Sequence, residues 1–136
     1  MSMPAVAVSG DGKRFAAAWK DVRAGSPRVW WAQGAEPRLE KEAAVAKEGG
    51  EQDHPRIAFD ARGVAWVAWE EGRRTEARVR LRALGREGSP IDVTGASQGT
   101  PAFPVLATGP AFVVVAWETS GDGGDRVFAT VVSTPP

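Results

Sequence analysis

The chain has 136 residues, of which 43% are hydrophobic and 25% charged, a composition that indicates one globular domain and excludes a disordered chain. Seventeen basic residues balance seventeen acidic ones, so we expect neither nucleic acid nor a membrane as a partner. The lack of cysteine excludes disulfides and thiolate metal sites, and there is one histidine, so we expect no metal and no cofactor.

The ends of the chain and its apolar runs predict a soluble protein. The longest apolar run, from Phe112 to Trp117, is too short to span a bilayer. The first four residues, Met1 to Pro4, have neither the cationic start nor the apolar core of a signal peptide. The compartment stays open; the expectation is the cytoplasm if the chain is complete.

Three copies of one pattern follow one another along the chain. Each copy begins with a proline, one variable residue, an aliphatic residue and an alanine, in the segments Pro4 to Val8, Pro55 to Phe59 and Pro104 to Thr108. A glycine-containing turn and an apolar run ending in Ala-Trp follow, at Trp19, Trp69 and Trp117. Arg-Val comes nine positions after each tryptophan, at Arg28, Arg78 and Arg126. The period of 50 and then 48 residues between the tryptophans fits four strands with their turns.

The apolar runs predict β-strands. The runs from Val64 to Trp69 and from Phe112 to Trp117 lack polar alternation, which is typical of strands buried on both faces. A fourth strand is predicted from Ile91 to Thr94 in the second copy and at about Leu39 to Ala46 in the first. The segment from Leu39 to Ala46 has good helix formers, so its prediction as a strand depends on the repeat and not on residue propensity. Only four residues follow Val132, so the third copy ends after three strands. The copies cover approximately residues 3–50, 51–99 and 100–136 of a single domain.

The motif Pro-x-(Ile/Val/Leu)-Ala, then glycine, then an apolar run to Ala-Trp and Arg-Val, resembles the repeats of sialidase-like (BNR-type) β-propellers. The resemblance covers most of the chain. It implies an all-β fold of three β-propeller blades of about four antiparallel strands each, the third lacking its last strand, and hence half of a six-bladed propeller. A sialidase uses a tyrosine nucleophile, and this chain has no tyrosine. The segment from Ser120 to Gly124 approaches the family's Asp-box, but its position between the second and third strands indicates a glycine-rich hairpin turn.

The tryptophans have two interpretations. Three of them recur in every copy, which favours packing between neighbouring blades over a platform for stacking a sugar: Trp19, Trp69 and Trp117. Trp30 and Trp31 occupy adjacent strand positions, so their side chains point to opposite faces. One of this pair can therefore contribute to an interaction surface.

In a propeller, the loops that enter the first strand and those that join the second to the third lie at the same end of every blade. This end collects charged side chains, and the predicted ligand-binding residues are Asp21, Arg23, Asp53, His54, Glu71, Arg73 and Glu118. Carboxylates paired with arginines suit a polar ligand, although hairpin turns are also polar because they face water. The segment from Asp122 to Asp125 has too few ligands for a calcium loop, so no metal site is predicted. No catalytic residue is assigned.

Two functions of different classes fit these residues. The leading prediction is a non-catalytic β-propeller module, a protein- or glycan-binding scaffold. The alternative is a sialidase-like glycoside hydrolase or a fragment of one, with carboxylates such as Glu71 and Glu118 as acid and base. The chain can also be a piece of a longer propeller. Because propellers use about four to eight blades, three blades cannot close a ring. We therefore expect a homodimer that completes a six-bladed ring.

Overall fold

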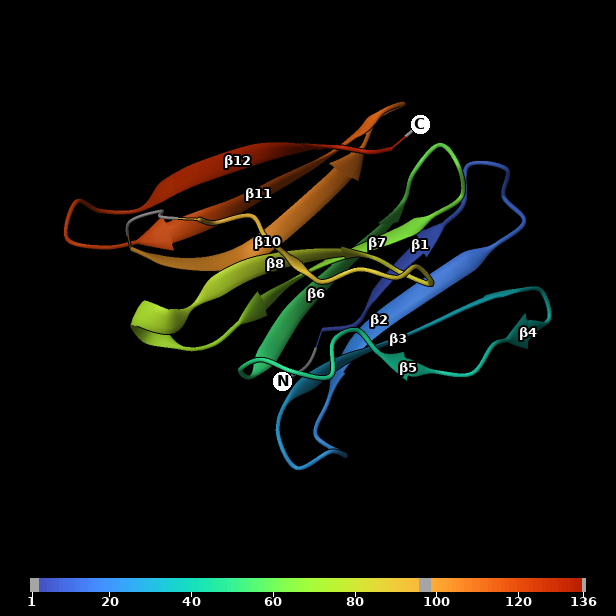
Figure 1. Cartoon of the computed structure of the whole chain (residues 1–136), viewed down its shortest axis with the longest axis horizontal. Coiled ribbons are helices and arrows are strands. Elements are labelled where there is room, and N and C mark those ends of the chain that lie inside the picture. The colour runs from blue at the N-terminus through green and yellow to red at the C-terminus, as the bar shows by residue number, and fades with distance from the viewer. Residues whose placement is uncertain (1–2, 96–98, 136) are drawn as a thin grey trace.

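The structure, a computed structural model, describes residues 3–95 and 99–135. Within these ranges the regular structure is β-strand apart from one 3-10 turn, η1 (Arg74–Glu76), and it contains no helix long and apolar enough to cross a membrane. The strands form three antiparallel sheets, none of which closes on itself (Figure 1). Met1 and Ser2, which precede the first predicted copy, and residues 96–98 and Pro136, near the ends of the second and third copies, lie outside the described residues.

Each sheet corresponds to one copy of the repeat. The first contains β1 (Ala5–Val8), β2 (Phe15–Asp21), β3 (Arg28–Ala35) and β4 (Arg38–Leu39) in that order, with β5 (Ala43–Ala44) also paired to β3. The second has the order β6 (Gln52–Phe59), β7 (Ala65–Glu71), β8 (Arg78–Ala83) and β9 (Ile91–Asp92). The third has the order β10 (Thr100–Thr108), β11 (Phe112–Ser120) and β12 (Arg126–Ser133). The all-β prediction is confirmed, and within the described ranges the third sheet has three strands, as expected.

The Ala-Trp pair of each copy divides its sheet into two faces. Because neighbouring strand residues point to opposite sides, alanine and tryptophan cannot share a face. We call the side that carries Trp19, Trp69 or Trp117 the tryptophan face. The side that carries the preceding Ala18, Ala68 or Ala116 is the alanine face. The strand register then assigns each residue that is paired across these strands to one of the two faces.

The core consists of two layers between the three sheets. In the first layer, Ala16 and Ala18 of the first sheet pack with Val67 and Trp69 of the second. In the second layer, alanine-face residues of the second sheet pack with tryptophan-face residues of the third: Trp66, Ala68, Val79 and Leu81 with Val113, Val115 and Trp117. Both layers therefore have the same construction, with an alanine face packed on the tryptophan face of the next sheet. This packing buries all of the β7 residues except Glu70.

The recurring tryptophans confirm the packing prediction at two of three positions. Trp69 is fully buried between the first and second sheets, and Trp117 is buried between the second and third. Trp19 is only half-buried, because within the described residues no sheet covers the tryptophan face of the first sheet. Trp31 packs against the first core layer, whereas Trp30 pairs with Trp19 on that outer face. The two adjacent tryptophans thus have the different environments that their alternation predicts.

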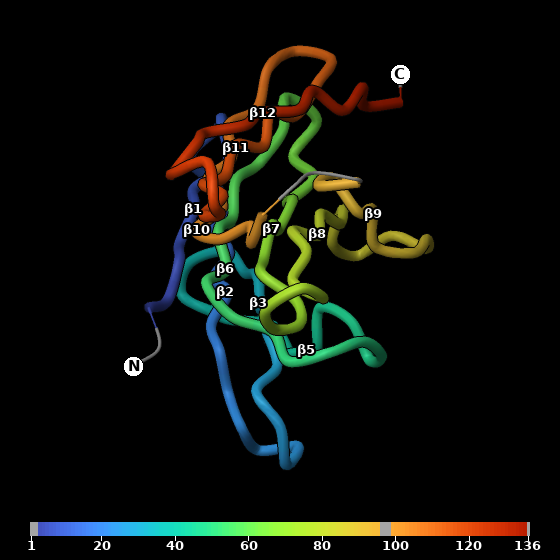
Figure 2. Tube along the Cα trace, turned by 90° about the vertical axis from the view of Figure 1, so that its left-hand side faces the viewer, coloured from blue at the N-terminus to red at the C-terminus, as the bar shows by residue number. Residues whose placement is uncertain are grey.

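The first strands of the sheets lie side by side. Strand β6 contacts both β1 and β10. Figure 2 shows β1, β6 and β10 toward one side of the stack and β5 and β9 at the other. The beginnings of β6 and β10 are paired with the ends of β7 and β11, where the predicted ligand-binding residues are concentrated.

Candidate functional site

The residues that directly precede the repeated prolines of the second and third copies adopt a rare backbone conformation. His54 has a φ of 47° and Phe103 a φ of 53°. A positive φ is uncommon for residues other than glycine, and a following proline restricts the backbone further. Both residues lie at a shift in strand register, one at the start of β6 and one at the start of β10. These β-bulges redirect the two side chains at the ends of neighbouring first strands.

Five side chains form a row across the three sheets at this end, and we call it the rim row: Lys20, Asp53, His54, Glu70 and Phe103. Lys20 Nζ lies 2.7 Å from Asp53 Oδ2, and His54 Nδ1 lies 2.7 Å from Glu70 Oε2. The other oxygen of Glu70, Oε1, accepts a hydrogen bond from the backbone N–H of Phe103. The rings of His54 and Phe103 meet edge to face, with centroids 4.9 Å apart. The rim row therefore links each sheet to the next through polar contacts.

Asp53 is held as a carboxylate within this row. Partial burial acts to raise its pKa, but hydrogen bonds from Lys20 Nζ and from the backbone N–H of His54 outweigh burial and lower the pKa below its usual 3.8. The charge pair with Lys20 is therefore present at neutral pH. Phe103 remains 54% exposed at the other end of the row. The row thus combines an exposed aromatic ring with ordered charges.

Asp21, at the end of β2, and Arg23, in the β2–β3 loop, form a separate cluster. Arg23 Nε donates to Asp21 Oδ2 over 2.8 Å, its other side-chain nitrogens also reach Asp21 and Glu42, and its guanidinium carbon lies 4.6 Å from the centre of the Trp30 ring. Hydrogen bonds from the Arg23 side chain and backbone lower the pKa of Asp21, and those carboxylates raise the pKa of Arg23. This cluster packs against Trp30 on the tryptophan face of the first sheet, whereas Lys20 of the rim row lies on the alanine face.

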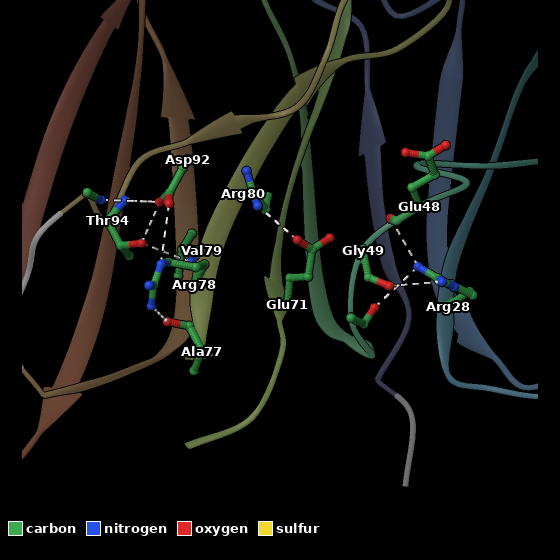
Figure 3. A network of polar contacts seen from close by, with 12 residues as sticks. Arg28, Glu48, Gly49, Glu71, Ala77, Arg78, Val79, Arg80, Asp92 and Thr94 are labelled. Atoms are coloured by element: carbon green, nitrogen blue, oxygen red, sulfur yellow. Dashed lines mark hydrogen bonds and ion pairs between the residues drawn. The ribbon is translucent and has the colours of Figure 1, made fainter. Parts of the chain in front are cut away.

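Glu71 is buried and bonded within the second sheet. Its side chain lies on the tryptophan face of the second sheet, the residue is 7% exposed, and Oε2 accepts a hydrogen bond from Arg80 Nε over 2.9 Å (Figure 3). A Cβ atom at Gly49, whose φ is 102°, would lie 2.5 Å from Glu71 Oε1. Arg28 holds the same loop through the carbonyl oxygens of residues 48–50. Glu71 therefore packs between Arg80 and the loop that leads from the first sheet to the second.

The remaining predicted residues are more exposed. Arg73 Nη2 lies 2.5 Å from Glu51 Oε2, in a pair whose arginine side chain is 76% exposed. Glu118 is exposed on the alanine face of the third sheet, and it has no hydrogen bond or ion pair within residues 3–95 and 99–135. Glu71 and Glu118 thus lie on faces directed away from each other, on two different sheets. This arrangement does not form a pair of facing carboxylates.

The rim row contains two of the seven predicted ligand-binding residues, Asp53 and His54, and three residues that were not among them. Asp21 and Arg23 are brought together in their own cluster. Lys20 and Glu70 directly follow the repeated tryptophans, as Glu118 does, and Phe103 precedes a repeated proline as His54 does. Aligning the three copies at these positions is the signal that finds the row. Charge alone does not find it, because Phe103 is apolar.

Two hollows lie away from the rim row. One, of about 300 Å³, is lined by Trp66 and by arginines that include Arg62 and Arg86. The other is an open groove of about 870 Å³ along the β11–β12 hairpin. The segment from Ser120 to Gly124 forms the turn of this hairpin, with the N–H of Gly124 donating to the oxygen of Gly121 over 3.0 Å, as predicted.

The described ranges contain no group of three or more histidine, aspartate and glutamate side chains placed to hold a metal ion. The sequence matches no protein-family model and no curated protein.

Proposed function

We propose that the chain is a non-catalytic binding module built from β-propeller-type sheets, and that its rim row binds a hydroxyl-rich carbohydrate. The repeated stacking of an alanine face on a tryptophan face supports a blade-like relation between the sheets, because each sheet meets the next in the same way. The adjacent first strands support it further, since they would line the axis of a propeller.

The observation that carries the carbohydrate proposal is the edge-to-face pair of His54 and Phe103 on two β-bulges. Non-glycine residues with positive φ persist only where their surroundings hold them, and they concentrate at binding sites. Here two such residues on separate sheets meet at a ring distance of 4.9 Å. Their rare backbone conformations present one exposed aromatic surface at the rim.

The polar groups beside this surface suit hydroxyl groups. Ligand sites combine apolar or aromatic contact area with a few fixed polar groups that set orientation. The Phe103 ring offers contact area, and the carboxylates of Asp53 and Glu70 are held by Lys20 and His54. Carboxylate oxygens have capacity for further hydrogen bonds and accept them from hydroxyl groups.

A glycan array with the purified chain, followed by calorimetry on the best ligand, tests this proposal. Phe103→Asn removes the ring and suits a positive φ, because asparagine tolerates that conformation. We expect this variant and Glu70→Gln each to weaken binding at least about 10-fold. Leu39→Ala, a truncation at an exposed apolar position in β4, is the matched control and should bind like the wild type.

Two results would overturn the proposal. One is an array without any binding by folded protein. The other is hydrolysis of an arrayed glycoside that is lost in Glu71→Gln, which would favour the glycoside hydrolase instead.

A further inference from the structure

One repeat position has opposite environments at the two ends of the stack. The valine of Arg-Val is fully buried in the first and second sheets, as Val29 and Val79, but Val127 of the third sheet is 74% exposed. The aliphatic residue of the first strand behaves in the reverse order: Ile57 is 8% exposed, whereas Val6 of the first sheet is 78% exposed. The same residue types are therefore buried or half-buried where a neighbouring sheet is present and exposed where none is.

These positions belong to the two sides of one interface. Val79 packs in the second core layer together with Leu106, the residue equivalent to Val6. Val29 packs in the first layer together with Ile57, which is again that equivalent position. Each time, the valine comes from an alanine face and its aliphatic partner from the tryptophan face of the next sheet. Val127 and Val6 occupy the same two positions on the two outer faces, where no sheet within the described residues covers them.

The surrounding residues repeat the same relation. The tryptophan face of the first sheet carries apolar side chains that are exposed or half-buried: Val6, Val8, Phe15, Trp19 and Trp30. The alanine face of the third sheet does so too: Val105, Val114, Ala116, Val127 and Val131. Contiguous apolar surface of this kind marks interaction sites. The two uncovered faces are of the two kinds that already pack on each other twice within the chain.

We propose that the alanine face of the third sheet packs on the tryptophan face of the first sheet of a second copy. A polar contact supports this occupant. Glu70, at the end of an alanine face, accepts a hydrogen bond from the N–H of Phe103, which precedes the proline of the next sheet. Glu118 occupies the position of Glu70 on the third sheet and is exposed. The equivalent donor is the N–H of Met3, which precedes Pro4, in the second copy.

Two copies close this arrangement. The contact is heterologous, since different faces meet, and such contacts either form a ring or continue as a filament. With two copies, both alanine faces and both tryptophan faces are covered, and six sheets surround one axis. Six lies within the range of about four to eight units that closed stacks of this kind use. Three copies would give nine sheets, outside that range.

Light scattering on the full chain, from micromolar concentration downward, tests the proposal. We expect a dimer for the wild type, and dissociation constants raised at least about 100-fold by Val6→Asp or by Val127→Lys, because each places an unpaired charge in an apolar interface. Val22→Asp, at a valine that is 63% exposed in the β2–β3 loop, is the matched control and should remain dimeric.

Mixing the two interface variants sharpens the test. In a mixed dimer, one interface is wild type and the other joins two substitutions of opposite charge, so the dimer should return. Glu118→Gln removes only the charge of one acceptor and should weaken the dimer about 10-fold without affecting folding, which circular dichroism checks. A folded wild-type monomer, a trimer, a filament, or a mixture of variants that stays monomeric would each overturn the proposal.

Discussion

The interior layers and the two outer faces of this protein are made of the same residues at the same repeat positions, yet their exposure is opposite. Trp69 is fully buried where the first sheet covers it, and its equivalent Trp19 is half-buried on the first sheet's own outer face. The Ala-Trp and Arg-Val motifs alone therefore do not determine whether their side chains are buried. They specify a sheet with two different apolar faces, and a neighbouring sheet determines whether each face is buried.

Deleting the central tryptophan is the most direct way to break this comparison. Trp69→Ala should lower the free energy of unfolding by about 3–5 kcal/mol, because it leaves a large cavity in a packed layer. Trp19→Ala should cost only about 1–2 kcal/mol in dilute protein, because its face is uncovered there. Chemical denaturation of both variants measures the difference. Equal unfolding midpoints for Trp69→Ala and the wild type would show that the layer is not packed as described.

A matched pair of valines sharpens the comparison at one position. Val79→Ala removes two buried methyl groups and should cost about 2 kcal/mol at any protein concentration. Val127→Ala should cost less than about 0.5 kcal/mol in protein dilute enough to be monomeric, as is usual at exposed positions. Denaturation over a range of concentrations tests this pair. A cost for Val127→Ala that is large and independent of concentration would contradict the exposed environment of Val127.

A smaller effect than that of Val79→Ala is predicted at Asp60, which supports the interior layer at Trp66. Asp60 Oδ2 accepts a hydrogen bond from Trp66 Nε1 over 3.0 Å, and Oδ1 accepts two from the backbone of the β6–β7 turn. Burial acts to raise the pKa of Asp60, but these hydrogen bonds outweigh it and lower the pKa below 3.8. Asp60→Asn should therefore cost about 1 kcal/mol at neutral pH.

The pH dependence of this effect has a definite sign. Because the folded pKa is the lower one, the contribution of the Asp60 carboxylate is complete well above pH 3.8 and is lost as the pH falls through the folded pKa. Thermal unfolding between about pH 2 and 7 should show a smaller loss of stability on the acid side in Asp60→Asn than in the wild type. Parallel curves for the two proteins would contradict this assignment.

The sequence was sufficient to predict the strands, because their signals are local. Apolar runs, turn glycines and a constant spacing from Ala-Trp to Arg-Val predicted the three sheets and the three-stranded third sheet in the described residues. The weakest prediction was the fourth strand of the first copy. The segment from Leu39 to Ala46 contains the last residue of β4 and the whole of β5, two strands of two residues each with a break between them. The helix formers in this segment do not prevent strand pairing, but the paired strands remain only two residues long.

The candidate site could be predicted only in part, because it depends on contacts between copies. Charge at the loops selected Asp53 and His54, which lie in the rim row. It also selected Glu71, whose carboxylate is buried against Arg80 and Gly49. No single segment of the sequence indicates these two neighbours of Glu71, because Gly49 lies in the loop that follows the first sheet and Arg80 lies in β8. The left-handed backbone of Phe103 is likewise a result of the bulge in β10, which alternation does not predict.

Because the second sheet is covered on both faces, we also expect the sheets to open in a definite order. In stacked repeats, each unit is stabilised mainly by its neighbours, so local opening begins at the ends of the stack. Strand β7 is buried between two sheets, whereas β12 lies at an edge, with an exposed or half-buried side chain at every position. Backbone amides of β7 should therefore exchange with deuterium only during global unfolding, and those of β12 through small openings that leave the first two sheets intact.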